Sequence, residues 1–97
     1  MLIDSLKNYT TEELVEALND KSVLVRCGVI SECARRKNVE SAVTTAIAAR
    51  TKSTDAFWNN YFESDFAEAA LHILNVKKYK GKRREVKQLI SARLQFD

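Results

Sequence analysis

The sequence predicts an all-α domain of five or six helices in antiparallel pairs. The chain of 97 residues contains no proline and only two glycines, whereas turn-rich β folds need many of both. Apolar residues recur at helical spacing in several segments, and the connections between these segments are short, which favours antiparallel neighbours. With 45% hydrophobic and 30% charged residues, we expect one globular domain covering residues 1–97.

The clearest local signal marks the first helix. In the stretch YTTEEL, Thr10 can cap the helix and Glu13 completes a capping box. The helix should end near Asn19 and Asp20, two residues that favour turns.

The second helix should begin after Ser22, which can act as its N-cap. Its apolar residues cover more than one stripe, so we expect it to pack on several sides. Cys27 and Cys33 fall on different faces of this helix and cannot bridge each other. We interpret both as small core residues in a reducing cytosol.

Three further stretches complete the predicted helices. Asn38 can cap a helix over Val39–Arg50. In residues 55–74 the aromatic residues have i, i+1, i+4, i+5 spacing, which indicates helix; whether one helix runs throughout or a second begins at Ser64 stays open. A last helix is expected over Lys82–Leu94.

Arg26 lies inside an otherwise apolar run, and this run carries a family resemblance. The segment LVEALNDKSVLVRCGVISECARR resembles a HEAT repeat, with Asp20 in the turn and Val25-Arg26 early in the second helix. The resemblance implies a small right-handed α-α superhelix in which Asp and Arg bond between neighbouring units. A buried arginine also needs an acceptor, and Asp20 is the nearest in sequence. We therefore expect Asp20 and Arg26 to be structural.

A second copy of the pattern follows at an offset of 41 residues, which suits this class of repeat. It aligns Phe66 with Val25. Ala67 then replaces Arg26, and Tyr61 replaces Asp20, so the polar contact between units is not expected to continue.

Little in the chain points to catalysis. There is one histidine, and no glycine-rich phosphate loop, metal-ligand cluster or nucleophile motif. His72 lies one helical turn after Glu68, but a histidine without a nucleophile is more often structural. We predict a non-enzymatic protein without metal or cofactor.

The positive charge is concentrated in one segment, residues 77–87. It carries seven cations and one acid, a net charge of +6, whereas the whole chain has +3, so the remainder has −3. Three of these cations are expected in the first turn of the last helix, where the dipole disfavours them. The segment either binds an anionic partner or forms a solvated loop. The cations are Lys77, Lys78, Lys80, Lys82, Arg83, Arg84 and Lys87.

Our leading hypothesis is a small protein-binding module of the adaptor, inhibitor, immunity or anti-defence type. Trp58 and Tyr61 would be apolar anchors on a helical face, and the 77–87 cations would steer an acidic partner. The alternative is nucleic-acid binding through the same cations. No segment has the length of a membrane span, so we expect a cytoplasmic protein, with a homodimer left open.

Overall fold

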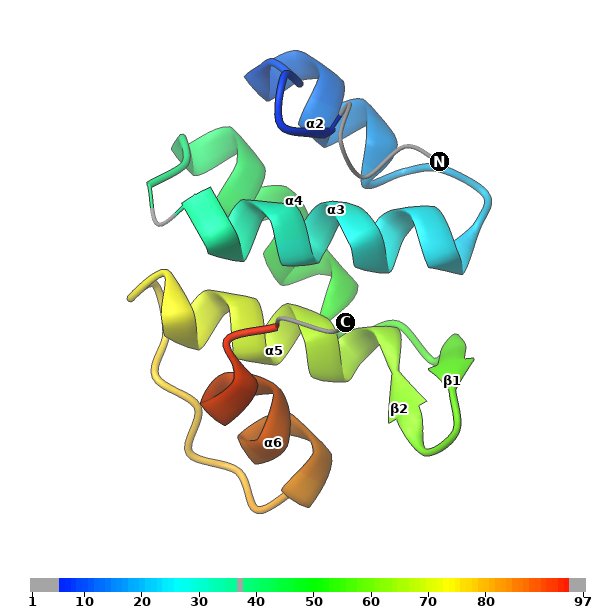
Figure 1. Cartoon of the computed structure of the whole chain (residues 1–97), viewed down its shortest axis with the longest axis vertical. Coiled ribbons are helices and arrows are strands. Elements are labelled where there is room, and N and C mark those ends of the chain that lie inside the picture. Colours follow the sequence, from blue (N-terminus) through cyan, green and yellow to red (C-terminus); the bar gives the residue numbers. More distant parts are fainter. Residues whose placement is uncertain (1–5, 37, 95–97) are drawn as a thin grey trace.

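The computed structural model describes residues 6–36 and 38–94. Within them, five helices and one two-stranded hairpin occur (Figure 1). The predicted helical architecture is confirmed in this coarse form, and the hairpin is an addition. In chain order the elements are α2 (Thr11–Ala17), α3 (Val23–Arg36), α4 (Ser41–Arg50), β1 (Ala56–Trp58), β2 (Tyr61–Phe62), α5 (Glu63–Ile73) and α6 (Arg84–Ala92).

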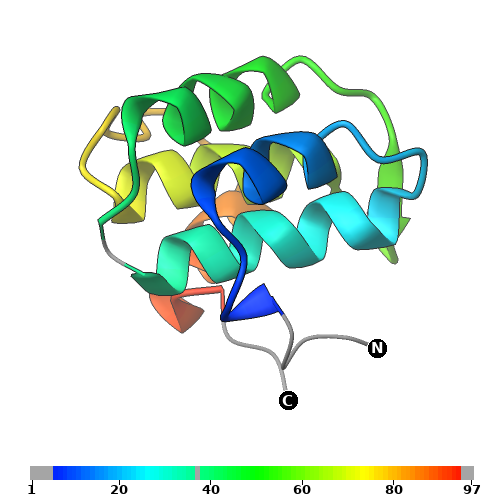
Figure 2. The same cartoon turned by 90° about the horizontal axis from the view of Figure 1, so that it is seen from above.

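Helix α5 lies at the centre of the arrangement. α3 lies beside α5 and runs in the same direction, α6 covers the opposite side, and α4 packs against both α5 and α2 (Figures 1 and 2). Because α5 has three helical neighbours, Ala67, Ala69 and Ala70 are completely buried. Their small side chains allow these neighbours to approach closely.

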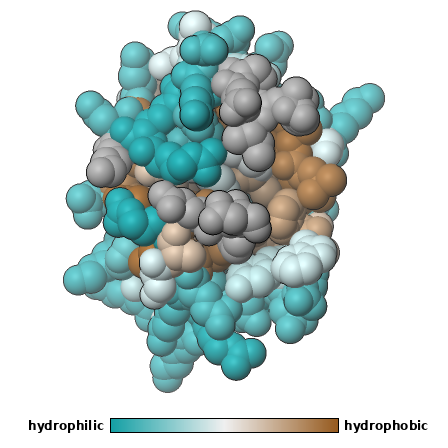
Figure 3. Space-filling model, viewed as in Figure 1, coloured by the Kyte–Doolittle hydropathy of each residue, from teal (hydrophilic) through white to brown (hydrophobic). Residues whose placement is uncertain are grey.

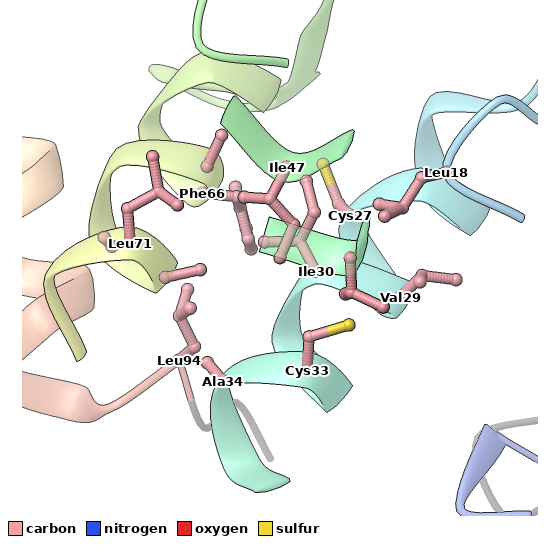
Figure 4. Packing of buried hydrophobic residues seen from close by; sticks show 14 of the residues in the cluster. Leu18, Cys27, Val29, Ile30, Cys33, Ala34, Ile47, Phe66, Leu71 and Leu94 are labelled. Carbon is pink, nitrogen blue, oxygen red and sulfur yellow. The ribbon is translucent and has the colours of Figure 1, made fainter. Parts of the chain in front are cut away.

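The core is one continuous apolar cluster to which all five helices contribute, and α3, α4 and α5 supply its centre (Figure 4). Phe66 and Leu71 from α5 face Ile30 of α3 and Ile47 of α4. α3 is buried on several sides, as its broad apolar pattern predicts, and Cys27 and Cys33 are both unpaired core residues.

The N-termini of α2 and α3 follow the sequence signals, whereas the N-terminus of α4 does not. The capping box of α2 is confirmed: Thr10 N donates to Glu13 Oε1 at 2.8 Å, and Glu13 N donates to Thr10 Oγ1 at 3.2 Å. Ser22 Oγ accepts from Val25 N at 3.4 Å at the start of α3. The prediction that Asn38 caps the third helix is wrong, because α4 begins at Ser41 and its N-cap, Glu40, makes no side-chain cap.

The expected helix over residues 55–62 is wrong. Trp58 pairs with Tyr61 in an antiparallel hairpin with a two-residue loop, Asn59-Asn60, and α5 begins only at Glu63. Asn59 has φ 59°, and asparagine tolerates the left-handed backbone that tight hairpin loops require. In this irregular hairpin, Phe57 and Tyr61 both pack on Phe66. They are four residues apart, the spacing of one helix face, which is why the helical interpretation failed.

The last helix starts later than predicted. α6 begins at Arg84, so Lys82 precedes the helix and Arg83 is its N-cap residue. Of the three cations expected in its first turn, Arg84 alone lies there. The buried face is as expected, with Val86 and Leu89 in the core.

Candidate interaction surface

Arg26 is buried and fully bonded. It is 6% exposed, and its Nε donates to Glu63 Oε2 at 2.8 Å. Its Nη2 donates to Asp55 Oδ2 at 2.6 Å, and its Nη1 to the backbone carbonyl of Asp20 at 2.6 Å. The expected contact with Asp20 thus exists through the backbone, while the carboxylate of Asp20 accepts from Ser22 N. A structural role of Arg26 explains the cation in the apolar run.

Sequence reasoning missed Glu63, the centre of this network. Glu63 is completely buried and also accepts from Arg50 Nε at 2.8 Å and Ser53 Oγ at 2.7 Å. Burial raises the pKa of this carboxyl, but the hydrogen bonds from Arg26, Ser53 and Arg50 outweigh burial and hold the pKa below its usual range. Nothing in its sequence neighbourhood distinguishes Glu63 from an exposed first-turn glutamate.

The hairpin has an inner and an outer face. On the inner face, the rings of Phe57 and Tyr61 pack edge-on against Phe66, with centroids 4.8 and 6.4 Å away. Tyr61 Oη also donates to Gln88 Oε1 at 2.8 Å. On the outer face, Trp58 is 66% exposed and Phe62 38%. Of the two predicted anchors, Trp58 is therefore accessible, whereas Tyr61 is half-buried and serves the scaffold.

Exposed apolar residues occur on the hairpin and on the neighbouring end of α3. Leu24, in the first turn of α3, is 64% exposed, and α3 contacts β1. In Figure 3, hydrophobic atoms over the N-terminal half of α3 adjoin the pale atoms of the hairpin at the right edge. We call Leu24, Trp58 and Phe62 the hairpin patch.

Arg83 holds the hairpin in place. Its Nε and Nη2 donate to the two carboxylate oxygens of Asp65 at 2.6 and 2.8 Å, and Nη2 also donates to the carbonyl of Asn60 at 2.7 Å. The guanidinium lies 5.2 Å from the centroid of Phe62. The hydrogen bonds with Asp65 raise the pKa of Arg83. Arg83 was expected to bind a partner, but the structure places it as a clamp between loop, hairpin and α5.

The other cations of the basic segment are exposed. No carboxylate in the described part of the chain lies within ion-pair distance of them. We call them the free cations; they are Lys77, Lys78, Lys80, Lys82, Arg84 and Lys87.

Three arginines outside the basic segment, Arg35, Arg36 and Arg50, are already paired. Arg35 and Arg36 bind Glu32 at 3.1 Å each, and Arg36 also donates to the carbonyl of Leu6. Arg50 lies at the hairpin end of α5, bound to Glu63, whereas Lys77 follows the other end. The structure therefore does not gather all of these cations around one site.

His72, the residue considered for acid–base chemistry, is hydrogen-bonded within the fold, and the two cysteines are buried. His72 Nδ1 accepts from Tyr79 N at 3.0 Å, so the imidazole anchors the loop after α5. Burial raises the pKa of Cys27 and of Cys33 to about 12, which leaves little thiolate at neutral pH. Among residues 6–36 and 38–94, no three His, Cys, Asp or Glu side chains are grouped to hold a metal ion.

Comparison with protein-family models, with curated proteins and with solved structures found no match. Over the described residues, no helix has both the length and the apolar character needed to cross a bilayer.

Proposed function

We propose that this protein is a small non-enzymatic protein-binding module, of the adaptor, inhibitor, immunity or anti-defence type. One observation carries the proposal: Trp58 exposes two thirds of its surface on a hairpin that is fixed on its inner face. Tryptophan is the residue type most enriched at the energetic centre of protein interfaces. The hairpin patch is the contact surface, and the free cations attract an acidic partner.

The scaffold around Trp58 lowers the entropic cost of binding. Phe57 is packed on Phe66, Tyr61 is bonded to Gln88, and Arg83 clamps the loop at Asn60. A side chain presented by a fixed backbone loses less conformational freedom when a partner binds. Burying the indole then contributes most of its apolar surface to the complex.

We also propose how the helices are arranged. We interpret α2–α3 and α4–α5 as two antiparallel pairs stacked in a small right-handed α-α superhelix of the HEAT type. Support comes from the packing of α2 on α4 and of α3 on α5, which have equivalent places in the two pairs. The contact between Arg26 and Glu63 joins the two pairs, although the second copy of the sequence pattern lacks the aspartate and arginine of the first. This stacking leaves one concave or flat side of the superhelix free to bind a macromolecule.

An affinity experiment with two matched variants tests this function. Immobilised wild-type protein, Trp58→Ala and Val76→Ala are compared for retention of the same host protein. Val76 is also exposed, at 52%, but follows the far end of α5. We expect Trp58→Ala to weaken binding by about 30-fold, the effect of a hot-spot residue, and Val76→Ala to bind as the wild type does. Equal affinity of all three proteins would exclude the hairpin patch.

Nucleic-acid binding is the second candidate, favoured by the six free cations. A phosphate binder that neutralises several phosphates loses affinity steeply when salt rises from about 50 to about 200 mM. A band-shift titration on nonspecific duplex DNA over this range tests it. Absent binding, or binding that does not weaken with salt, removes this candidate.

A further inference from the structure

The chain after α5 turns back along that helix toward the hairpin. Lys77 N donates to the carbonyl of Leu71 at 3.3 Å, and Arg83 binds Asp65 on the same helix. Six residues separate Leu71 from Asp65, about 9 Å of helix. Figure 1 shows this loop beneath α5, leading into α6. The loop therefore connects the far end of α5 with the hairpin patch.

The loop has a defined shape because Tyr79 is held at three points. Tyr79 N donates to His72 Nδ1, and Tyr79 Oη accepts from Arg83 N, both at 3.0 Å. Gly81 lies so close to the ring of Tyr79 that a Cβ there would overlap it. The neighbouring lysines are thus carried by an ordered backbone.

Three of the free cations surround a hollow in this loop. An open pocket of about 550 Å³ is lined by Lys77, Lys78 and Lys80 together with Tyr79, Gly81 and Glu68. The three ammonium groups outnumber the single carboxylate, so the pocket attracts anions. Lysine ammonium groups that lack a partner in the protein are available to carboxylates of a ligand.

Arg83 joins this loop to the hairpin patch, since it binds Asp65, the carbonyl of Asn60 and the ring of Phe62. We infer that loop and patch form one elongated surface for an extended acidic segment of a protein partner. Acidic side chains lie along the loop lysines, and an apolar side chain rests on Trp58 and Leu24. This inference depends on the proposed protein-binding function and specifies its ligand.

A peptide fits this surface better than a nucleic acid strand does. Arg83, which binds the hairpin loop, has its planar donors committed to Asp65, and such donors are the ones best suited to phosphates. Glu68 in the pocket would repel a continuous phosphate backbone. Leu24, the third residue of the hairpin patch, offers aliphatic rather than aromatic contact, which suits an apolar side chain more than a base.

Titration with two fluorescent peptides tests the inference. One is poly-glutamate, and the other carries a single leucine near one end. The loop variant replaces Lys77, Lys78 and Lys80 by glutamate. A control variant replaces Lys7, Lys21 and Lys52 by glutamate, which changes the net charge equally at exposed positions elsewhere.

We expect the loop variant to bind both peptides about tenfold more weakly than wild type and the control variant to lose less than about threefold. Wild type should bind the leucine peptide more tightly than poly-glutamate, with a blue shift of emission from Trp58, the single tryptophan. Trp58→Ala should lose this preference and keep the affinity for poly-glutamate.

Several results would overturn the inference: no peptide binding, equal weakening in both triple variants, or tighter and steeply salt-dependent binding of oligothymidylate. If neither peptide binds but Trp58→Ala still abolishes retention of a host protein, the acidic segment is excluded as the ligand and the protein-binding function is still supported. If neither experiment depends on Trp58, both proposals fall.

Discussion

Arg26 and Glu63 form a buried ion pair between α3 and α5, although 37 residues separate them in the sequence. The Nε to Oε2 distance is 2.8 Å, and their side chains are 7% and 0% exposed. Arg50 brings the end of α4 to the same carboxylate. Because each buried charge has a partner, this cluster sets the relative positions of three helices, and several predictions depend on it.

Replacing Glu63 by glutamine should destabilise the fold strongly. The amide keeps the shape but leaves Arg26 and Arg50 without their shared counter-charge. We expect the free energy of unfolding in urea to fall by about 3–5 kcal/mol, the usual effect of removing one partner from a buried pair. The control is Glu12→Gln on the exposed face of α2, with a loss below about 0.5 kcal/mol. A loss below about 1 kcal/mol for Glu63→Gln would contradict the structural role.

Acid should destabilise the protein through the same carboxylate. The pKa of Glu63 is lower in the folded chain than its ordinary value of 4.5. Its contribution to stability is therefore complete above the unfolded pKa and is lost as the pH falls through the folded pKa. Urea titrations between about pH 7 and about pH 3 should show this decline. The decline should be smaller in Glu63→Gln, and an identical profile in both proteins would argue against the assignment.

Arg83→Lys should loosen the hairpin while preserving the charge. Lysine cannot form the two parallel bonds that Arg83 makes with Asp65. We expect a loss of about 1–2 kcal/mol in stability and faster hydrogen exchange at Phe62 N, which donates to Asp65. Arg84→Lys is the matched control, because Arg84 makes no ion pair within the described residues. Equal exchange rates in the two variants would show that Arg83 is no clamp.

The effect of a substitution at Asn59 on stability should depend on how well the new residue tolerates the left-handed backbone of the hairpin loop. With φ at 59°, Asn59→Gly should be neutral or slightly stabilising, whereas Asn59→Val should cost about 1–2 kcal/mol. Thermal unfolding of the two variants provides the measurement. If valine is tolerated as well as glycine, the loop does not hold the left-handed conformation in solution.

Both cysteines should be protected from thiol reagents in the native protein. With the pKa of each raised to about 12 by burial, thiolate is scarce at neutral pH, and access is blocked as well. Labelling with a disulfide reagent should proceed at the rate of unfolding and accelerate in urea. Rapid labelling without denaturant would contradict the burial of Cys27 and Cys33.

Local patterns predicted the parts of the fold that depend on local physics. The capping box at Thr10 and Glu13 is specified by residues three apart, and α3 carries enough apolar residues to require burial on several sides. The apolar spacing of Val86 and Leu89 likewise predicts the inward face of α6. These features do not depend on which other helix is the neighbour.

The sequence pattern gave a wrong prediction where a helix and a hairpin produce the same spacing of aromatic residues. Trp58 and Tyr61 are three residues apart, which suits a helix turn and also a two-residue hairpin loop. The choice depends on Phe57 and Tyr61 packing on Phe66 and on Arg83 binding the loop. The latter contact spans 23 residues, beyond the reach of any local pattern.

The amino-acid sequence by itself determined a helical chain with a basic segment at residues 77–87 and a buried arginine in need of acceptors, because propensity, charge and desolvation are properties of the residues themselves. The tertiary structure alone decided which acceptor Arg26 uses, that Arg83 is engaged while its neighbours are free, and that Trp58 rather than Tyr61 faces solvent. Those outcomes depend on contacts between segments distant in sequence, whose geometry exists only once the helices have packed.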